Sequence, residues 1–230
     1  MSRLVLLALN HSKAKDTLNK NSQFIVVEGG EGVGKTHFCR GLERQLKADG
    51  RKVWLTKEPG GTSIANDIRK LFLSPPATEK LQPLAELLLV SAARVQHVAK
   101  ISEEINAGTT VICDRFTDST MVYQGVLGGI DEKTISYFNE CATDKLHPGL
   151  TILLDCPVEI AQDRLKARDK LQQPETRFDG GSFQKHETIR NGFLKLTKNK
   201  PNSVVIDASL SPDEVLNEGL KILKERVFES

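Results

Sequence analysis

The sequence has few cysteines, and none of them forms a recognisable pair. The four cysteines among the 230 residues are scattered, at Cys39, Cys113, Cys141 and Cys156, and never spaced as CxxC. This spacing offers neither the ligand pairs of a structural zinc site nor the framework of a disulfide-rich domain. We therefore expect a protein of a reducing compartment, the cytoplasm.

A strong excess of one charge is also missing. Lys and Arg together number 32 and Asp and Glu 30, which gives a formal net charge of +2. Proteins that bind nucleic acid usually carry a concentrated basic patch. We expect no nucleic-acid partner.

Long apolar runs are absent from the N-terminal part of the chain. The run from Leu4 to Leu9 is shorter than a usual signal-peptide core, is followed by no A-x-A cleavage site, and cannot cross a bilayer. We expect residues 1–22 to form an extension to a single domain at 23–230, with no membrane partner. A transit sequence is the alternative interpretation of the extension.

Short apolar runs that alternate with longer helical patterns dominate the rest of the sequence. The helical pattern from Pro83 to Ala107 ends at Gly108, and SPDE (211–214) is typical of a capped helix start. The alternation predicts an α/β fold, a five-stranded parallel sheet with helices on both faces, whose ligands bind at the carboxyl ends of the strands. The predicted strands are QFIVVE (23–28), RKVWLT (51–56), TTVICD (109–114), LTILLD (150–155) and NSVVID (202–207).

A glycine-rich stretch, GGEGVGKT, follows the first predicted strand and fits the pattern GxxxxGK[ST]. The backbone N–H groups of such a loop and the start of the next helix hold nucleotide phosphates. Lys35 is predicted to reach the β- and γ-phosphates, and Thr36 to bind magnesium. Asp114, at the tip of a buried strand, is predicted to lie beside the magnesium, the alternative being a helix cap. The predicted ATP-binding residues are Gly29, Gly30, Glu31, Gly32, Val33, Gly34, Lys35 and Thr36.

The elements of a GTP-binding switch are missing. TKNKPN is the nearest match to a guanine-binding NKxD element, and it lacks the aspartate. Arginines in predicted loops indicate phosphoryl transfer instead. Arginine binds phosphates, and it stabilises the negative charge that develops while a phosphoryl group is transferred. Arg164 and Arg168 share one helical face, which is either functional or simply solvated. The arginines are Arg69, Arg94, Arg115, Arg164, Arg168 and Arg177.

Taken together, the motifs VVEGGEGVGKT, TKEPGGT, SAARVQHV and DRFTDSTMVYQG are similar to those of the thymidylate kinases. The resemblance covers about residues 23 to 228. It implies a P-loop nucleoside monophosphate kinase fold with a lid at about 166–182, phosphorylation of dTMP by ATP and Mg²⁺, and a homodimer. The alternatives are a deoxynucleoside kinase, another nucleoside monophosphate kinase with relaxed pyrimidine specificity, or a nucleotide-sensing module without turnover.

The resemblance also implies roles for single residues. Glu31 would approach the 3′-hydroxyl of dTMP, Tyr123 would lie against the deoxyribose, and lid arginines would neutralise the ATP phosphates. The implied dTMP-binding residues are Glu31, Lys57, Pro59, Arg69, Val90, Arg94, Arg115, Thr120, Tyr123 and Gln124. The implied catalytic residues are Lys35, Asp114, Arg115, Arg164, Arg168 and Arg177, and the implied metal ligands are Thr36 and Asp114.

The sequence departs from the family pattern at several positions. Val90 stands where the family usually has a phenylalanine that stacks on thymine, so we expect ring stacking to be lost there. Lys57 replaces an arginine and loses its planar fork. Gly32 and Val33 stand where one branch of the family carries an arginine, so the sequence resembles the bacterial-type branch, which supplies its cation from the lid.

Overall fold

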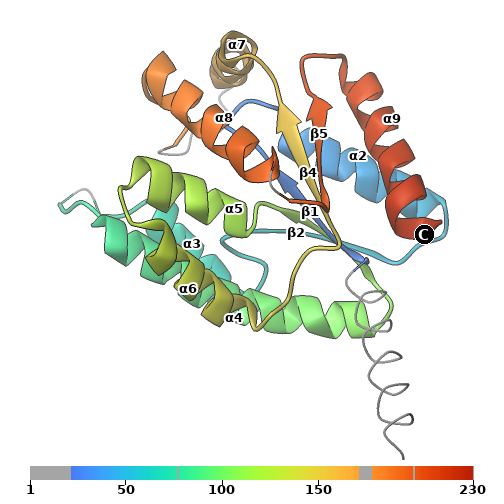
Figure 1. Ribbon diagram of the computed structural model, residues 1–230, viewed down its shortest axis with the longest axis horizontal. Coiled ribbons are helices and arrows are strands. Elements are labelled where there is room, and N and C mark those ends of the chain that lie inside the picture. The colour runs from blue at the N-terminus through green and yellow to red at the C-terminus, as the bar shows by residue number, and fades with distance from the viewer. Residues whose placement is uncertain (1–21, 77, 171–177, 199, 230) are drawn as a thin grey trace, which may run out of the picture.

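Parallel strands form one sheet at the centre of the molecule (Figure 1). The computed structural model describes residues 22–76, 78–170, 178–198 and 200–229. The 5-stranded sheet has the order β2-β3-β1-β4-β5, which confirms the predicted α/β class. The strands are β1 (Phe24–Glu28), β2 (Val53–Lys57), β3 (Thr110–Asp114), β4 (Leu150–Asp155) and β5 (Ser203–Asp207), each within two residues of its predicted bounds.

The central strand β1 is apolar on both faces and divides the core in two. Ile25 and Val27 pack into one cluster, and Phe24 and Val26 into another. Successive side chains of a strand point to opposite faces, so a strand that is buried on both sides reads as a continuous apolar run. This explains why FIVVE shows no polar alternation.

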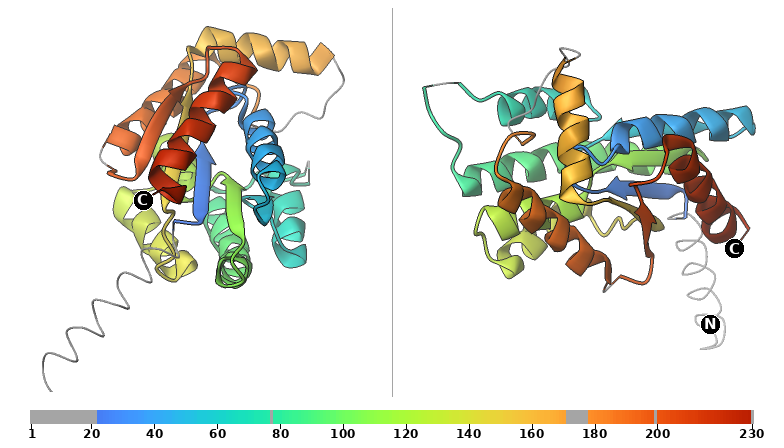
Figure 2. Two further views of the ribbon diagram at one scale, coloured as in Figure 1. Left: turned by 90° about the vertical axis from the view of Figure 1, so that its right-hand side faces the viewer. Right: turned by 90° about the horizontal axis from the view of Figure 1, so that it is seen from above.

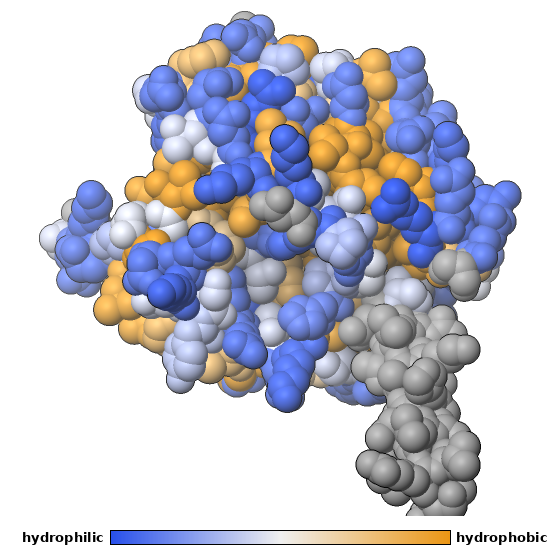
Figure 3. Space-filling model, viewed as in Figure 1, coloured by the Kyte–Doolittle hydropathy of each residue, from blue (hydrophilic) through white to orange (hydrophobic). Residues whose placement is uncertain are grey.

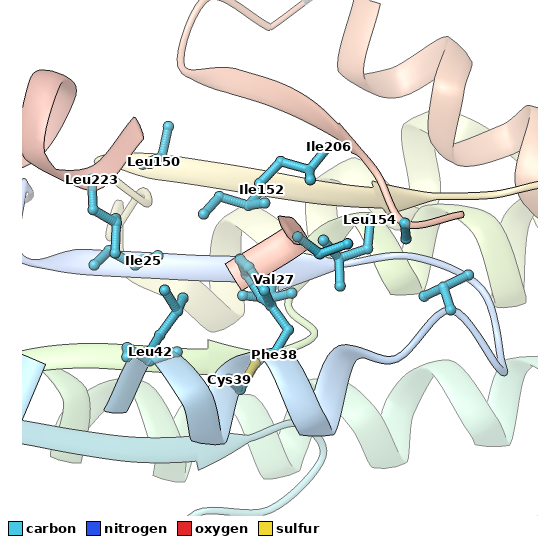
Figure 4. Close-up of a cluster of buried hydrophobic side chains, with 14 of the residues drawn as sticks. Ile25, Val27, Phe38, Cys39, Leu42, Leu150, Ile152, Leu154, Ile206 and Leu223 are labelled. Carbon is cyan, nitrogen blue, oxygen red and sulfur yellow. The ribbon is translucent and has the colours of Figure 1, made fainter. Parts of the chain in front are cut away.

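Helices cover both faces of the sheet. Figure 4 shows Phe38 and Leu42 of α2 and Leu223 of α9 against the first face. On the second face, α4 packs on β1 and β3, and α8 packs on β4. The helical segments are α2 (Lys35–Ala48), α3 (Ser63–Leu73), α4 (Pro83–Asn106), α5 (Thr117–Thr120), the π-helical η1 (Met121–Leu127), α6 (Glu132–Thr143), α7 (Val158–Lys170), α8 (Phe183–Lys198), α9 (Pro212–Leu223) and the π-helical η2 (Lys224–Phe228).

Local capping signals fix the ends of several helices. Gly50 (φ 80°) and Gly108 (φ 79°) adopt the left-handed conformation just past α2 and α4, and Gly108 ends its helix as the sequence predicts. Ser211 and Glu214 form the predicted reciprocal capping box at the start of α9. These ends depend on a few neighbouring residues, which is why they are visible in the sequence.

The carboxyl ends of the strands form the edge at which a ligand site is expected. The loop after β1 enters α2 on one face, while β1 itself lies between β3 and β4. Helix α7 stands at this end of the sheet, beyond the tips of the strand arrows (Figure 2). Among the described residues, no helix combines the length and apolar character needed to span a membrane.

Candidate active site

A cleft of about 860 Å³ lies at the carboxyl ends of the strands. Of the sequence-predicted residues, Gly29, Gly30 and Val33 do not line it, and Arg177 lies outside the described residues. The remaining predictions come together in this one space, from elements far apart in the sequence. They are Glu31, Gly32, Gly34, Lys35, Thr36, Lys57, Pro59, Arg69, Val90, Arg94, Asp114, Arg115, Thr120, Tyr123, Gln124, Arg164 and Arg168.

The loop from Gly29 to Gly34 curls tightly before α2. Gly29, Gly32 and Gly34 all have positive φ, which an L side chain rarely adopts. Lys35 donates to the carbonyls of Gly29 (3.0 Å) and Gly30 (2.5 Å). Burial, together with the nearby Arg115, lowers the pKa of Lys35 to about 8. The lysine is thus held inside the loop, where an anion can replace the carbonyls as its partner.

Close packing at Gly32 excludes a side chain from the loop. A Cβ there would lie 2.3 Å from the carbonyl oxygen of Ala161 in α7, and φ is +78°. An arginine at this position therefore requires α7 to move. The packing thus leaves no room for a loop arginine at this position, and the lid as the source of the cation stays a prediction.

Thr36 and Asp114 meet at the floor of the cleft. The hydroxyl of Thr36 donates to Asp114 Oδ2 at 3.2 Å, which joins the start of α2 to the end of β3. A hydroxyl and a carboxylate are hard oxygen donors, and Mg²⁺ is commonly held by one or two such groups together with phosphates. The pair fits the predicted magnesium site.

Glu31 links the glycine loop to the segment after β3. Its Oε1 accepts from Tyr123 Oη (2.5 Å) and from Arg115 Nη2 (2.9 Å). Its Oε2 is buried and has no hydrogen-bond partner among the described residues. A buried acceptor without a partner is costly, so Glu31 Oε2 is ready to accept a hydrogen bond from a hydroxyl of a ligand.

Arg115 is held by the same loops. Its backbone has a positive φ of 74°, and its Nη1 donates to the carbonyl of Gly29 (2.9 Å) and to Ser119 Oγ (3.1 Å). Burial acts to lower the pKa of Arg115, but Tyr123 and Glu31 outweigh it and raise the pKa above its ordinary value. The guanidinium is a fixed positive charge beside the phosphate loop.

Glu28 supports this arrangement and was missed by the sequence analysis. Its carboxylate accepts from the backbone N–H groups of Phe116 (2.8 Å) and Ser119 (3.2 Å) and from the Ser119 hydroxyl (2.6 Å). Burial, with the nearby Asp118, raises the pKa of Glu28 to about 6. An acid that ends an otherwise apolar strand was the available signal.

Arg94 lies at the far end of the cleft, within a dense set of partners. It donates to Glu58 Oε2 (2.8 Å), Asn139 Oδ1 (2.6 Å) and Thr120 Oγ1 (2.9 Å). Gln124, predicted beside Thr120, donates to Glu86 Oε2 at 3.1 Å. Asn139 comes from α6, which the sequence analysis did not connect with the site.

Two further predicted cations, Lys57 and Arg69, line the cleft. Arg69 Nη1 donates to the carbonyl of Pro59 at 2.9 Å, so the predicted pair forms one wall. The nearby Arg69 lowers the pKa of Lys57. Positive charges this close favour a ligand with an anionic group.

Two phenylalanines that the sequence analysis did not foresee accompany Val90. Phe72 of α3 and Phe178 belong to the same apolar cluster as Val90, and their rings stack with centroids 5.5 Å apart. Phe178 also meets Tyr123 edge-on at 5.2 Å. All four side chains line the cleft, so this end of it is aromatic despite the valine.

Arg164 and Arg168 both reach the cleft from one face of α7, as their spacing predicts. Arg164 Nη1 donates to the carbonyl of Ala208, just after β5, at 2.8 Å. Arg168 Nη2 forms an ion pair with Asp179 at 2.9 Å. Of the predicted lid, residues 171–177 lie outside the described residues.

Known proteins are similar in sequence to most of this chain. The family model for thymidylate kinase matches residues 27–218. A thymidylate kinase of Geotalea daltonii is 45% identical over 196 residues, which are 83% of this chain and 91% of that protein. Those of Geobacter sulfurreducens and Chlamydia muridarum are 41% and 40% identical, over 89% and 84% of this chain and 97% and 93% of theirs. The chain therefore belongs to the thymidylate kinase family.

Proposed function

We propose that the protein transfers the γ-phosphoryl group of ATP to dTMP, forming dTDP. The observation that carries this assignment is Glu31, which sits in the phosphate loop and also contacts Tyr123 and Arg115 on the acceptor wall. One continuous cleft thus contains both the phosphate loop and a second group of cations, Lys57, Arg69 and Arg115. Family membership supplies the identity of the two substrates.

On the donor side, the glycine loop would hold the ATP phosphates through its backbone N–H groups. Lys35 would exchange the carbonyls of Gly29 and Gly30 for phosphate oxygens. Thr36 and Asp114 would hold Mg²⁺. Held by these two side chains, Mg²⁺ would supply positive charge against the negative charge that develops during transfer.

On the acceptor side, the unpaired Oε2 of Glu31 would accept a hydrogen bond from the 3′-hydroxyl of dTMP. Arg69, Arg115 and Lys57 would surround its phosphate, in keeping with their place along the cleft. Arg94 and Thr120 would contact the edge of the thymine. Tyr123, with its hydroxyl fixed on Glu31, would lie against the sugar.

Transfer between these sites requires positioning more than covalent chemistry. The acceptor phosphate is already anionic, so no strong general base is needed, and the protein must align the groups in line and offset their charge. Arg115 is held by its hydrogen bonds to Gly29 and Glu31 of the glycine loop. Arg164 and Arg168 reach the cleft from α7. These arginines are the proposed catalytic cations.

A deoxynucleoside kinase is the runner-up, and the charge of the cleft argues against it. Such an enzyme places a carboxylate base beside the 5′-hydroxyl and needs fewer cations at the acceptor end. Here Lys57, Arg69 and Arg115 line the acceptor region. An acceptor that already carries a phosphate suits them better.

A coupled assay of ADP release, run with dTMP, thymidine, dUMP and dCMP in turn, tests the assignment. We expect dTMP to be the best substrate and thymidine to give no turnover. Turnover of thymidine above that of dTMP would establish the runner-up, and ATP binding without any turnover would establish a sensing module. A Lys35→Ala variant should abolish the signal and so controls for contaminating kinases.

We also propose a cytoplasmic homodimer. All four cysteines are free, as a reducing compartment would keep them. The outer faces of α3 and α4, which pack side by side, expose large apolar side chains that a second copy could cover. These are Ile64, Leu71, Leu84, Leu88 and Val95.

A further inference from the structure

We propose that Glu58 and His97 are positioning residues that fix the Arg94 guanidinium for discrimination between pyrimidine bases. This inference rests on the proposed function, because it assigns the far end of the cleft to the base of the acceptor nucleotide. It concerns side chains other than those expected to touch that nucleotide: Glu58 lines the cleft, and the fully buried His97 contacts Glu58.

The guanidinium of Arg94 is immobilised on three sides. Only 2% of the residue is exposed, and Glu58, Asn139 and Thr120 each take one N–H group at 2.9 Å or less. A guanidinium carries five N–H donors. One hydrogen on each terminal nitrogen is therefore left for a ligand in the cleft, which Arg94 lines.

Glu58 is held in turn by His97. Glu58 Oε1 lies 3.0 Å from His97 Nδ1, and His97 Nε2 lies 2.8 Å from Thr56 Oγ1. An ionised carboxylate only accepts hydrogen bonds. His97 Nδ1 must then carry a hydrogen, and in a neutral imidazole Nε2 accepts from the Thr56 hydroxyl. The result is a directed chain from Thr56 through His97 to Glu58, which also accepts from Arg94.

Packing leaves this chain no freedom to turn. His97 is fully buried, and a Cβ on Gly61 would lie 2.2 Å from its ring. Trp54 meets the same ring edge-on, with centroids 5.6 Å apart. Burial acts to raise the pKa of Glu58, but Arg94 and His97 outweigh it and hold the pKa below its ordinary value. The carboxylate thus stays charged opposite Arg94.

A guanidinium fixed in this way discriminates by donor and acceptor pattern. It offers only donors, so it favours an oxygen at the edge of the base and disfavours an amino group in the same place. Thymine presents a carbonyl where cytosine presents an amino group. If Arg94 could rotate, it could turn its N–H groups away from the amino group, and the discrimination would weaken.

The kinetic test compares wild type with Glu58→Gln, which keeps the shape of the side chain and removes its charge. We expect the KM for dTMP to rise about tenfold, the change that loss of one charge-assisted hydrogen bond produces. The KM for ATP should stay unchanged, kcat should change less than about threefold, and the preference for dTMP over dCMP should fall. Glu104→Gln is the matched control and should change none of these constants, because this partly exposed residue lies near the end of α4, away from the cleft.

A second variant and a spectroscopic measurement cover the case in which Glu58→Gln does not fold, because breaking a buried ion pair is strongly destabilising. Thr56→Val removes only the hydroxyl that holds His97, and it should lower the preference for dTMP by a smaller factor. Nitrogen-15 NMR of the histidines, with His97 assigned through His97→Gln, should show the neutral Nδ1–H form in wild type.

The outcomes separate this inference from the proposed function. If wild type does not phosphorylate dTMP, the function fails, while the NMR result still tests the hydrogen-bond chain. The inference is overturned if His97 is found as the Nε2–H form or as an imidazolium. It is also overturned if wild type is active and folded Glu58→Gln or Thr56→Val keeps the full preference for dTMP over dCMP.

Discussion

Val90 lies in a part of the cleft where aromatic side chains come from neighbouring elements. From the sequence, valine at this position leaves a space where a ring would stack. In the structure, Phe72 and Phe178 belong to the cluster that contains Val90 and line the same cleft. The aromatic wall is present but comes from other elements.

Val90→Phe should therefore weaken dTMP binding, because a third ring enters a cluster that is already packed. Overpacking typically costs about 1–3 kcal/mol, so a loss of roughly tenfold in affinity is expected. Calorimetric titration of dTMP and thermal unfolding measure the two effects. Val90→Ile, which adds only one methylene, should stay close to wild type. Tighter binding of dTMP to folded Val90→Phe would show that the space is empty after all.

Candidate site residues could be predicted from the sequence where the residues of one motif are close together in the chain. Lys35 and Thr36 follow the glycines directly, and Asp114 and Arg115 end one strand, so their positions follow from local sequence. The Glu58–His97 pair is 39 residues apart in the chain and meets only when β2 and α4 pack. No local pattern reports such a contact, and both residues escaped prediction.

At the level of elements, α7 brings two arginines to the cleft, and they have different kinds of partner. Arg164 is held by the carbonyl of Ala208 beyond β5, whereas Arg168 pairs with Asp179. An ion pair with a side chain can be exchanged for phosphate oxygens. A hydrogen bond to the backbone keeps the helix itself in place.

Arg168→Ala should lower kcat by at least about tenfold and change the KM for dTMP less than about threefold. Catalytic arginines in phosphoryl transfer contribute roughly 10³ to 10⁵ in rate, and sharing among several cations softens each single loss. Steady-state kinetics with both substrates varied measures this. Lys166→Ala, an exposed residue of the same helix, is the control. A kcat for Arg168→Ala within a factor of two of wild type would contradict a catalytic role.

The strands and the capped helix ends follow from the sequence because their causes are local. The run FIVVE, the left-handed Gly50 and Gly108, and the Ser211–Glu214 box each depend on a few neighbours. The switch from α5 to η1 does not. That turn places Thr120 and Tyr123 in the cleft, yet its shape is set by packing against α6 and α8.

The whole molecule exposes apolar surface in two separate places. One is the outer face of α3 and α4, where Leu88 is 46% and Val95 50% exposed. The other is the edge strand β5, where Val205 is 49% exposed and where an apolar area lies between α8 and α9 in the space-filling view (Figure 3). The first extends over two adjoining helices, with Ile64 and Leu71 on α3 and Leu84, Leu88 and Val95 on α4.

A homodimer through α3 and α4 should dissociate when charge is placed on that face. We expect wild type to sediment as a dimer and the double variant Leu88→Lys, Val95→Lys to sediment as a monomer, because buried lysines without partners oppose association. Val205→Lys on the edge strand is the matched control and should remain a dimer. A monomeric wild type, or a dimer that only Val205→Lys breaks, would refute the proposed interface.

Glu31 has one further consequence, for the energetics of the two substrates. The loop proposed to receive the donor nucleotide also carries the carboxylate that contacts Tyr123 and Arg115, so a shift of that loop would change the proposed acceptor wall. The two binding free energies are then linked. Linkage is reciprocal, so the factor by which ATP changes the affinity for dTMP equals the factor by which dTMP changes the affinity for ATP, whichever binds first.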